Sequence, residues 1–430
     1  MTDVRRARRP PGRLLGSAGV IGAATLLANV LAYALFLVLN RTLTSDDLGA
    51  TAALLNITVI SGVLALALQL VAARHVATAS RPRNGSSPHR ARDPVGTEGS
   101  ALATGLILGL VVTAVVLAAS PLVAAAFDLD SLLPAVFVAL TVLPTYLTYA
   151  AQGCLHGRER FGALGLVFVA VAAGRFVAGA GAALSGLGVT GVLGFTVVAA
   201  WLAAGLALAL EPHGLGALRQ HLRATWLRAV VHGATATSAL LVVANLDIPL
   251  ARIFLTPEES GQYAVVALFS KAAYWGPAFL ATLFYPRMAR ATSRRSVLWA
   301  VGLTGAIAVV GVLVAALLAE PLVRLVGGPE YVDLATLVPL LTASGAAWSV
   351  AQVLVYWRLS RGDHRLGYAV WTVAAAVAAI VTLWRHESIT QIASTVLLGG
   401  LVVVGYGLAQ LARTPGVSAR RRARSGRPPR

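Results

Sequence analysis

The chain of 430 residues is poor in cysteine, in lysine and in charge. Its one cysteine, Cys154, excludes an intramolecular disulfide and a cysteine metal cluster. Its one lysine, Lys271, follows Ser270 and so excludes a phosphate-binding P-loop. Because no histidine spacing suits a metal either, we expect no metal and no cofactor. Charged residues make up 12% of the chain, against about 25% in soluble domains. An ordinary soluble domain is therefore excluded.

Long apolar runs recur along the chain, in which 57% of residues are hydrophobic. The runs are continuous rather than alternating, which favours membrane-spanning helices over a barrel. The first run, residues 14–39, exceeds the roughly 7–15 apolar residues of a signal peptide, so we expect it to be retained. We predict an all-α polytopic membrane protein with about 12 transmembrane helices. They lie near residues 14–39, 50–71, 100–120, 131–152, 161–184, 187–210, 229–251, 263–285, 297–318, 334–356, 366–384 and 390–411.

The basic residues indicate the orientation of these helices. Of 35 lysines and arginines, two fall inside helices (Arg175 and Lys271), and on one side lie only Arg41, Arg252, Arg324 and Arg385. All the others lie on the opposite side, which predicts cytoplasmic N- and C-termini. Because these arginines sit in short loops rather than on a soluble domain, the net charge of +18 does not indicate a nucleic-acid partner. The preference for arginine over lysine suggests a bacterial plasma membrane.

An internal repeat divides the chain into halves. Leu43-Thr44-Ser45-Asp46-Asp47-Leu48-Gly49 and Leu255-Thr256-Pro257-Glu258-Glu259-Ser260-Gly261 share the pattern Leu-Thr-x-acid-acid-x-Gly. We interpret the pattern itself as helix capping, because an acid follows each threonine at the capping-box spacing. The repeat predicts two six-helix lobes, residues 14–212 and 213–412, related by a pseudo-two-fold along the membrane normal. Residues 1–13 form a basic cytoplasmic N-terminus, and residues 413–430 form a disordered basic tail that contacts anionic lipid headgroups.

Four stretches resemble the polysaccharide and oligosaccharide flippases of the multidrug/oligosaccharidyl-lipid/polysaccharide (MOP) exporter superfamily. They are residues 40–49, Gln152-Gly153-x-Leu155-x-Gly157-x-x-Arg160-Phe161, Asn245-Leu246-Asp247 through Gly261-x-Tyr263, and Tyr285-Pro286-Arg287. The resemblance implies two six-helix lobes around a central cavity and no covalent chemistry. It also implies transport of lipid-linked sugars, lipid-linked peptidoglycan precursors or cationic drugs.

Three charged residues fall inside predicted helices: Arg175, Asp247 and Lys271. Charged groups at membrane depth are costly and point to function. We predict that Arg175 and Lys271 line a cavity and bind phosphate, because pyrophosphate offers many anionic acceptor oxygens. Asp247 would modulate their charge or take part in ion coupling. Two structural alternatives remain open: Asp247 pairs with Arg175 or Lys271 to lock two helices, or Lys271 snorkels to the outer headgroups.

Three asparagines, Asn29, Asn56 and Asn245, fall in the same outer half of the predicted bilayer. Their amides are able to bind the hydroxyl groups of a sugar. They are equally able to tie neighbouring helices together by hydrogen bonds. We therefore keep all three as candidate polar residues of the cavity, with both roles open.

These features predict a flippase that moves a polyprenyl-pyrophosphate-linked oligosaccharide across the plasma membrane by alternating access. Its partners would be this lipid-linked anionic sugar and the membrane lipids, and we expect it not to be an enzyme. One alternative is a cation-coupled drug antiporter, which a single intramembrane acid against two bases disfavours. A membrane glycosyl-transfer enzyme is a third reading. The longest predicted outer loop, residues 320–333, leaves it little room for a catalytic site.

Overall fold

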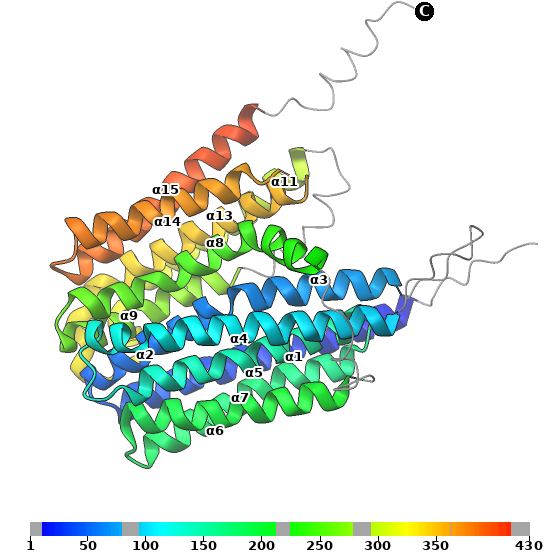
Figure 1. The fold of residues 1–430 in the computed structure, drawn as a ribbon. Coiled ribbons are helices and arrows are strands. Elements are labelled where there is room, and N and C mark those ends of the chain that lie inside the picture. Colours follow the sequence, from blue (N-terminus) through cyan, green and yellow to red (C-terminus); the bar gives the residue numbers. More distant parts are fainter. Residues whose placement is uncertain (1–10, 80–93, 212–223, 278–293, 362, 414–430) are drawn as a thin grey trace, which may run out of the picture. The chain divides into compact units, whose positions relative to one another are not determined.

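The computed structural model describes residues 11–79, 94–211, 224–277, 294–361 and 363–413, and regular structure within these ranges is entirely helical (Figure 1). The elements are α1 (Pro11–Thr42), α2 (Ser45–Ser61), α3 (Val63–Ala79), α4 (Pro94–Ala126), α5 (Leu133–Gly157), α6 (Phe161–Leu184), α7 (Gly188–Leu210), α8 (Ala224–Phe254), α9 (Pro257–Trp275), α11 (Arg294–Leu317), α12 (Ala319–Val326), the 3-10 helix η3 (Pro329–Leu337), α13 (Val338–Leu359), α14 (Arg365–Leu383) and α15 (Ile389–Arg413).

Within the described ranges, 10 helices are long and apolar enough to cross a membrane. Helices α2 and α3 count as one of them, because the segment Ser45–Ala79 is interrupted only at Gly62. The seventh and eighth predicted spans correspond to α8 and α9. The prediction of an all-α polytopic membrane protein with about 12 spans is therefore confirmed.

Several predicted boundaries were wrong. Helix α4 runs from Pro94 to Ala126, longer at both ends than the predicted span 100–120, because polar residues such as Glu98 begin it. The predicted outer loop 320–333 contains α12 and η3, which are too short for a hydropathy window to register. The basic N-terminus, the basic tail and Tyr285-Pro286-Arg287 lie wholly or largely outside the described residues.

The chain divides into two compact units that do not simply follow the two halves. Unit 1 comprises Met1–Leu39, Leu64–Val123 and Ser131–Val231, and unit 2 comprises Asn40–Val63, Ala124–Asp130 and His232–Arg430. Two short segments of the first half therefore belong to unit 2. The predicted boundary between residues 212 and 213 lies outside the described residues, so the lobes as predicted remain a prediction.

Helix interruptions lie close to the borders of the units. Gly62 separates α2 from α3. Its backbone amide donates hydrogen bonds to the carbonyl oxygens of Thr58 and Val59 at 3.2 and 3.1 Å. Pro121 lies inside α4 near the border at Val123. Proline removes one hydrogen bond of a helix and kinks it. Two of the borders between the units therefore lie near a break between helices at Gly62 and near a proline inside α4.

The two copies of the internal repeat meet inside unit 2. The side-chain hydroxyls of Thr44 and Thr256 cap α2 and α9. Each accepts a hydrogen bond from the backbone amide three residues further on, which confirms the capping interpretation. The helices α2 and α9 also pack together, and a Cβ on Gly261 would collide with the carbonyl group of Ser45. A Cβ on Gly49 would lie 2.8 Å from the amide nitrogen of Gly261. The repeat glycines are thus required by the close approach of these two helices.

Candidate functional site

Lys271 and Asp247 form an ion pair between α9 and α8 within unit 2. The Nζ atom of Lys271 lies 2.9 Å from Oδ1 of Asp247 and also donates to the carbonyl oxygen of Ala244. The hydroxyl of Tyr263 donates to the other carboxylate oxygen at 3.3 Å. The side chain of Asp247 is 4% exposed and that of Lys271 is 15% exposed. The pair is therefore desolvated, and both carboxylate oxygens have a donor.

This geometry bears on the two alternatives that the sequence left open for Lys271. Its ammonium group is held by the Asp247 carboxylate and the Ala244 carbonyl, which is the pairing of one alternative. It also does not snorkel, because its side chain is largely buried. Helix α9 begins at Pro257 rather than at residue 263, which places Lys271 about 21 Å along the helix at about 1.5 Å per residue. Lys271 therefore lies further along its helix than the predicted start at residue 263 implies.

A small cavity adjoins the ion pair. Its walls include Ser270 and Tyr274 of α9, Gly345 and Trp348 of α13, and Val396 of α15. Its volume of about 10 Å³ is enough for about one water molecule. A phosphate group is far larger than this. Lys271 therefore has no room for a phosphate in the conformation described.

Arg175 lies in α6, within unit 1. It is nine residues before Leu184, the end of the helix, or about 14 Å at about 1.5 Å per residue. Its side chain is half-buried and interacts electrostatically with Tyr149 of α5. Among the residues that the structure describes, no carboxylate pairs with Arg175. Of the two predicted phosphate-binding bases, only Arg175 has no ion-pair partner within the described part of the chain.

The three candidate asparagines differ in their surroundings. The amide of Asn56 donates to the carbonyl of Ala52 at 2.8 Å, and the amide of Asn245 donates to Leu241 at 2.7 Å. Both of these bonds close within the same helix, and both roles considered for these residues remain open. Asn29 is exposed on α1. A cavity role for the three residues remains a prediction.

A buried arginine was missed by the sequence analysis. Arg252 was expected in an outer loop, but α8 continues to Phe254 and the Arg252 side chain is 3% exposed. Its Nε donates to the carbonyl of Phe127 at 2.8 Å, and one terminal nitrogen contacts Asp46 and Ser260 at 2.5 and 3.1 Å. The acidic residue at position 46 in the repeat was the only available signal, and its spacing suggested a cap rather than an ion pair.

A second missed ion pair lies in unit 1. Arg158, just beyond α5, contacts the fully buried Glu98 of α4 through two nitrogens, one of them at 2.6 Å. Burial lowers the pKa of Arg158, but the hydrogen bond and charge of Glu98 outweigh burial and raise this pKa overall. Arg160 donates to the carbonyl of Leu210 at 2.6 Å. The Gly157-x-x-Arg160 motif therefore joins the ends of α4, α5 and α7.

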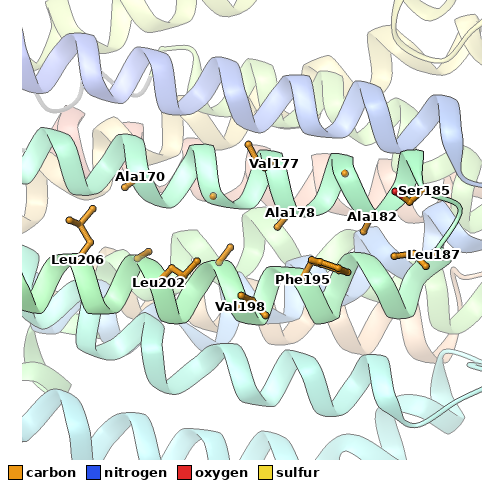
Figure 2. A pocket seen from close by; sticks show the side chains of 14 residues that line it. Ala170, Val177, Ala178, Ala182, Ser185, Leu187, Phe195, Val198, Leu202 and Leu206 are labelled. Atoms are coloured by element: carbon orange, nitrogen blue, oxygen red, sulfur yellow. The ribbon is translucent and has the colours of Figure 1, made fainter.

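An apolar groove of about 550 Å³ lies between α6 and α7, which run side by side in unit 1. Small residues of α6, including Gly174, Ala178 and Gly181, face larger ones of α7 such as Phe195 and Leu202. Figure 2 shows these side chains along the two helices, with Ser185 at one end as a polar lining residue. Both helices are apolar enough to span a membrane. The groove therefore fits a hydrocarbon chain rather than a sugar.

Comparisons with solved structures show the fold. An inward-facing multidrug resistance MATE transporter of the MOP superfamily superposes with a TM-score of 0.69 and 13% identity, over 90% of this chain and 94% of that one. The lipid II flippase MurJ in an inward closed conformation superposes with a TM-score of 0.70 and 9% identity, over 91% of this chain and 87% of that one. A MOP transporter from Pyrococcus furiosus superposes with a TM-score of 0.58 and 13% identity, over 93% of this chain and 96% of that one. It is described as having a binding pocket of reverse polarity.

Sequence comparisons cover a smaller part of the chain. Curated relatives from Mycobacterium bovis and from two strains of Mycobacterium tuberculosis are each 28% identical over 275 residues, which cover 61% of this chain and 62% of the relative. The chain thus matches less than two thirds of their length. They are described as uncharacterized and suggest no activity. No family model matches the chain. The likeness to solved structures shows the fold alone: the chain has the fold of the MATE and MurJ transporters of the MOP superfamily.

Proposed function

We propose that the chain is a flippase that moves a polyprenyl-pyrophosphate-linked oligosaccharide across the bacterial plasma membrane, with both termini in the cytoplasm. The observation that carries the proposal is Arg175, a cation inside a membrane-spanning helix with no carboxylate partner among the described residues. An arginine at the centre of a bilayer costs at least about 2.5–3.5 kcal/mol. A bound phosphate compensates that charge, and the guanidinium binds it in a bidentate way.

The apolar groove beside Arg175 supports a substrate that is also a lipid. Gly174 lines the groove, and Arg175 is the next residue of the same helix. Neighbouring residues of a helix are about 100° apart, so Arg175 is adjacent to a lining residue without lining the groove itself. We assign the phosphate to Arg175 and part of the hydrocarbon chain to the groove. An anionic lipid supplies both groups in one molecule, whereas a free sugar phosphate does not.

Lys271 plays a different part in this proposal. Its ammonium group is bonded to Asp247 and Ala244, and the adjoining cavity has room for about one water molecule. Lys271 therefore reaches phosphate only after it leaves Asp247. We propose that the pair opens when the substrate binds, and that Asp247 holds the charge of Lys271 while the site is empty. Asn29, Asn56 and Asn245 are proposed polar contacts of the same substrate.

The neutralised carboxylate argues against a drug antiporter. A site for cationic drugs presents negative charge, but Asp247 already has a lysine partner. The pyrococcal MOP transporter of similar fold is described as having a pocket of reverse polarity. We propose that this chain uses the fold with a cationic site. Fold alone does not determine the substrate, so we choose between an anionic lipid and a cationic drug by the charge of the site.

Purified protein with fluorescent undecaprenyl phosphate as the probe tests the phosphate site. Arg175→Gln is expected to weaken binding at least about tenfold, the factor given by about 1.4 kcal/mol. Arg175→Lys is expected to lose less, since ammonium keeps the charge but not the bidentate geometry. Arg385→Gln is the matched control, because Arg385 is exposed and bonds Ser394. Unchanged binding by Arg175→Gln would remove the phosphate site from the proposal.

The groove has its own matched pair of variants. A Cβ on Gly181 or on Gly205 would meet no atom within 4 Å, but only Gly181 lines the groove. Gly181→Leu is therefore expected to weaken binding of undecaprenyl phosphate and to spare a short-chain isoprenyl phosphate. Gly205→Leu should change neither. Equal effects of the two leucines would show that the groove does not hold the substrate chain.

A further inference from the structure

A cluster of arginines lies where α13 ends and α14 begins, within unit 2. Residues 358–365 contain Arg358, Arg361 and Arg365 against the single acid Asp363. The side chains of Arg361 and Arg365 are exposed, and that of Arg358 is half-buried. This turn therefore presents an excess of positive charge that a ligand is able to reach from outside the protein.

Two of these guanidinium groups are held on one aromatic ring. The Cζ atoms of Arg358 and Arg361 lie 4.7 and 5.3 Å from the ring centroid of Trp357. A cation within about 6 Å of a ring centroid is attracted to the face of the ring. Trp357 is itself fully buried in α13, so the ring is a fixed support. Because both cations contact the same ring, they are neighbours, and an anion that binds both relieves their repulsion.

The one carboxylate of the cluster does not use all the donors around it. Asp363 accepts from a terminal nitrogen of Arg358 at 2.9 Å, and its other oxygen accepts from the backbone amide of Arg365 at 3.0 Å. Nε of Arg358 is buried and has no hydrogen-bond partner within the described ranges. A guanidinium carries five N–H donors in a planar fork that matches the oxygens of a phosphate. Arg358 therefore keeps donors for a further anionic acceptor.

Exposed aromatic side chains indicate where this turn lies relative to a membrane. Tyr368 and Trp371 are in the first two turns of α14, and Trp299 is in the second turn of α11; all three are exposed. Helix α11 begins at the end of unit 2 where α13 ends, because α12 and η3 connect the two helices at their other ends. Tyrosine and tryptophan are enriched at the level of lipid headgroups. The arginine cluster is therefore expected at that level.

We propose that Arg358 and Arg361, stacked on Trp357, form a binding site for the phosphate of an anionic phospholipid in the leaflet at this end of unit 2. In the orientation proposed above, this is the cytoplasmic leaflet. The excess of positive charge favours a headgroup with a net negative charge, because a choline headgroup brings a cation of its own. The site is in unit 2, whereas Arg175 is in unit 1, and the bound lipid is not the transported substrate. The proposal therefore does not depend on what the chain transports.

Thermal unfolding of the purified full-length protein in a neutral detergent tests the site. Short-chain phosphatidylglycerol is the probe, because a ligand that binds only the folded protein raises the unfolding temperature. Phosphatidylcholine of the same chain length is expected to raise it less. Arg361→Gln is expected to weaken binding of phosphatidylglycerol at least about tenfold, as for the loss of hydrogen bonds to a charged group. Unchanged binding by this variant would overturn the site.

Two further variants separate a built site from a general attraction between charges. Arg361→Lys keeps the charge and is still expected to weaken binding, because an ammonium group lacks the planar fork. Arg413→Gln is the matched control, since Arg413 is an exposed arginine in the last turn of α15, and it should bind like the parent protein. Equal weakening by Arg361→Gln and Arg413→Gln, with none by Arg361→Lys, would leave only diffuse attraction. If Arg361→Gln does not fold, binding by Arg361→Lys decides in the same way.

Inorganic phosphate is the second probe, and it distinguishes a lipid from a free anion. It is added at the concentration of the lipid and at constant ionic strength. The proposal predicts little stabilisation by inorganic phosphate, because a lipid also contacts the apolar surface beside the cluster. Stabilisation as large as that by phosphatidylglycerol, lost in Arg361→Gln, would show that the site takes a free phosphate and would overturn the lipid proposal. Equal stabilisation by phosphatidylcholine would overturn the selection for negative charge.

Discussion

The buried pair of Lys271 and Asp247 yields a quantitative prediction. Lys271→Gln removes the ammonium and leaves the Asp247 carboxylate, 4% exposed, with the Tyr263 hydroxyl as its remaining bonded donor among the described residues. Removing one partner of a buried ion pair costs about 3–5 kcal/mol. We expect Lys271→Gln to lower the free energy of unfolding by about that amount. Asp247→Asn should cost less, because Lys271 keeps the carbonyl of Ala244 and gains an amide oxygen.

The double variant distinguishes the pair from two separate effects. With both charges gone, the cost of an isolated buried charge disappears, so the double variant should be more stable than Lys271→Gln alone. We expect a coupling energy of about 1–3 kcal/mol, in the range for residues in contact. Equilibrium unfolding in mixed micelles measures the four stabilities. A coupling energy below about 0.5 kcal/mol would refute the ion pair, because contacts of this kind exceed that value.

Transport by the same variants shows whether Lys271 does more than stabilise. If Lys271 takes phosphate during the cycle, the double variant is stable but moves substrate slowly. If the pair only locks α8 to α9, the double variant recovers both stability and transport. Recovery of transport would remove Lys271 from the substrate site and leave Arg175 as the remaining predicted base. The comparison therefore separates the two readings that the sequence left open.

Three further predictions concern topology and packing. Asp130→Cys should react with an impermeant reagent from outside, and Arg294→Cys should not, because the basic loops are cytoplasmic. Gly261→Ala should destabilise the protein by about 1–3 kcal/mol, since its Cβ would meet the carbonyl of Ser45 and overpack the contact. Arg158→Met should cost about 3–5 kcal/mol, because it breaks the ion pair with the fully buried Glu98; equilibrium unfolding measures both stabilities.

Controls for these predictions are available in the same chain. Labelling of Arg294→Cys from outside would contradict the orientation in the second half. Gly302→Ala serves as the match for Gly261→Ala, because a Cβ there would meet nothing within 4 Å. Equal stability of the two alanine variants would show that α2 and α9 do not approach as closely as described. Arg158→Met together with Glu98→Gln should regain most of the lost stability.

The amino-acid sequence alone was sufficient to predict where the membrane-spanning helices lie. A membrane-spanning helix needs about 20 apolar residues in one continuous run, and this signal is local. Boundaries were less accurate, as α4 shows, because polar residues such as Glu98 are buried beyond the end of the apolar run. The capping threonines were also predictable, because a capping box is defined by residues three apart.

The candidate site was less predictable because its contacts are long-range. Sequence marked Asp247 and Lys271 as costly charges, but the choice between a pair and a cavity depends on how α8 packs on α9. The role of Arg252 depends on Phe127, which is 125 residues away. No local pattern marks a carbonyl as the acceptor of a distant arginine.

Translocation in proteoliposomes tests the central claim most directly. A fluorescent undecaprenyl-pyrophosphate-linked sugar is placed in the membrane, and its appearance in the opposite leaflet is followed. The account predicts that the parent protein moves this lipid and that Arg175→Gln slows its transfer at least about tenfold, equivalent to about 1.4 kcal/mol. An equal rate in Arg175→Gln, or a parent protein that moves a cationic dye and not this lipid, would contradict the account.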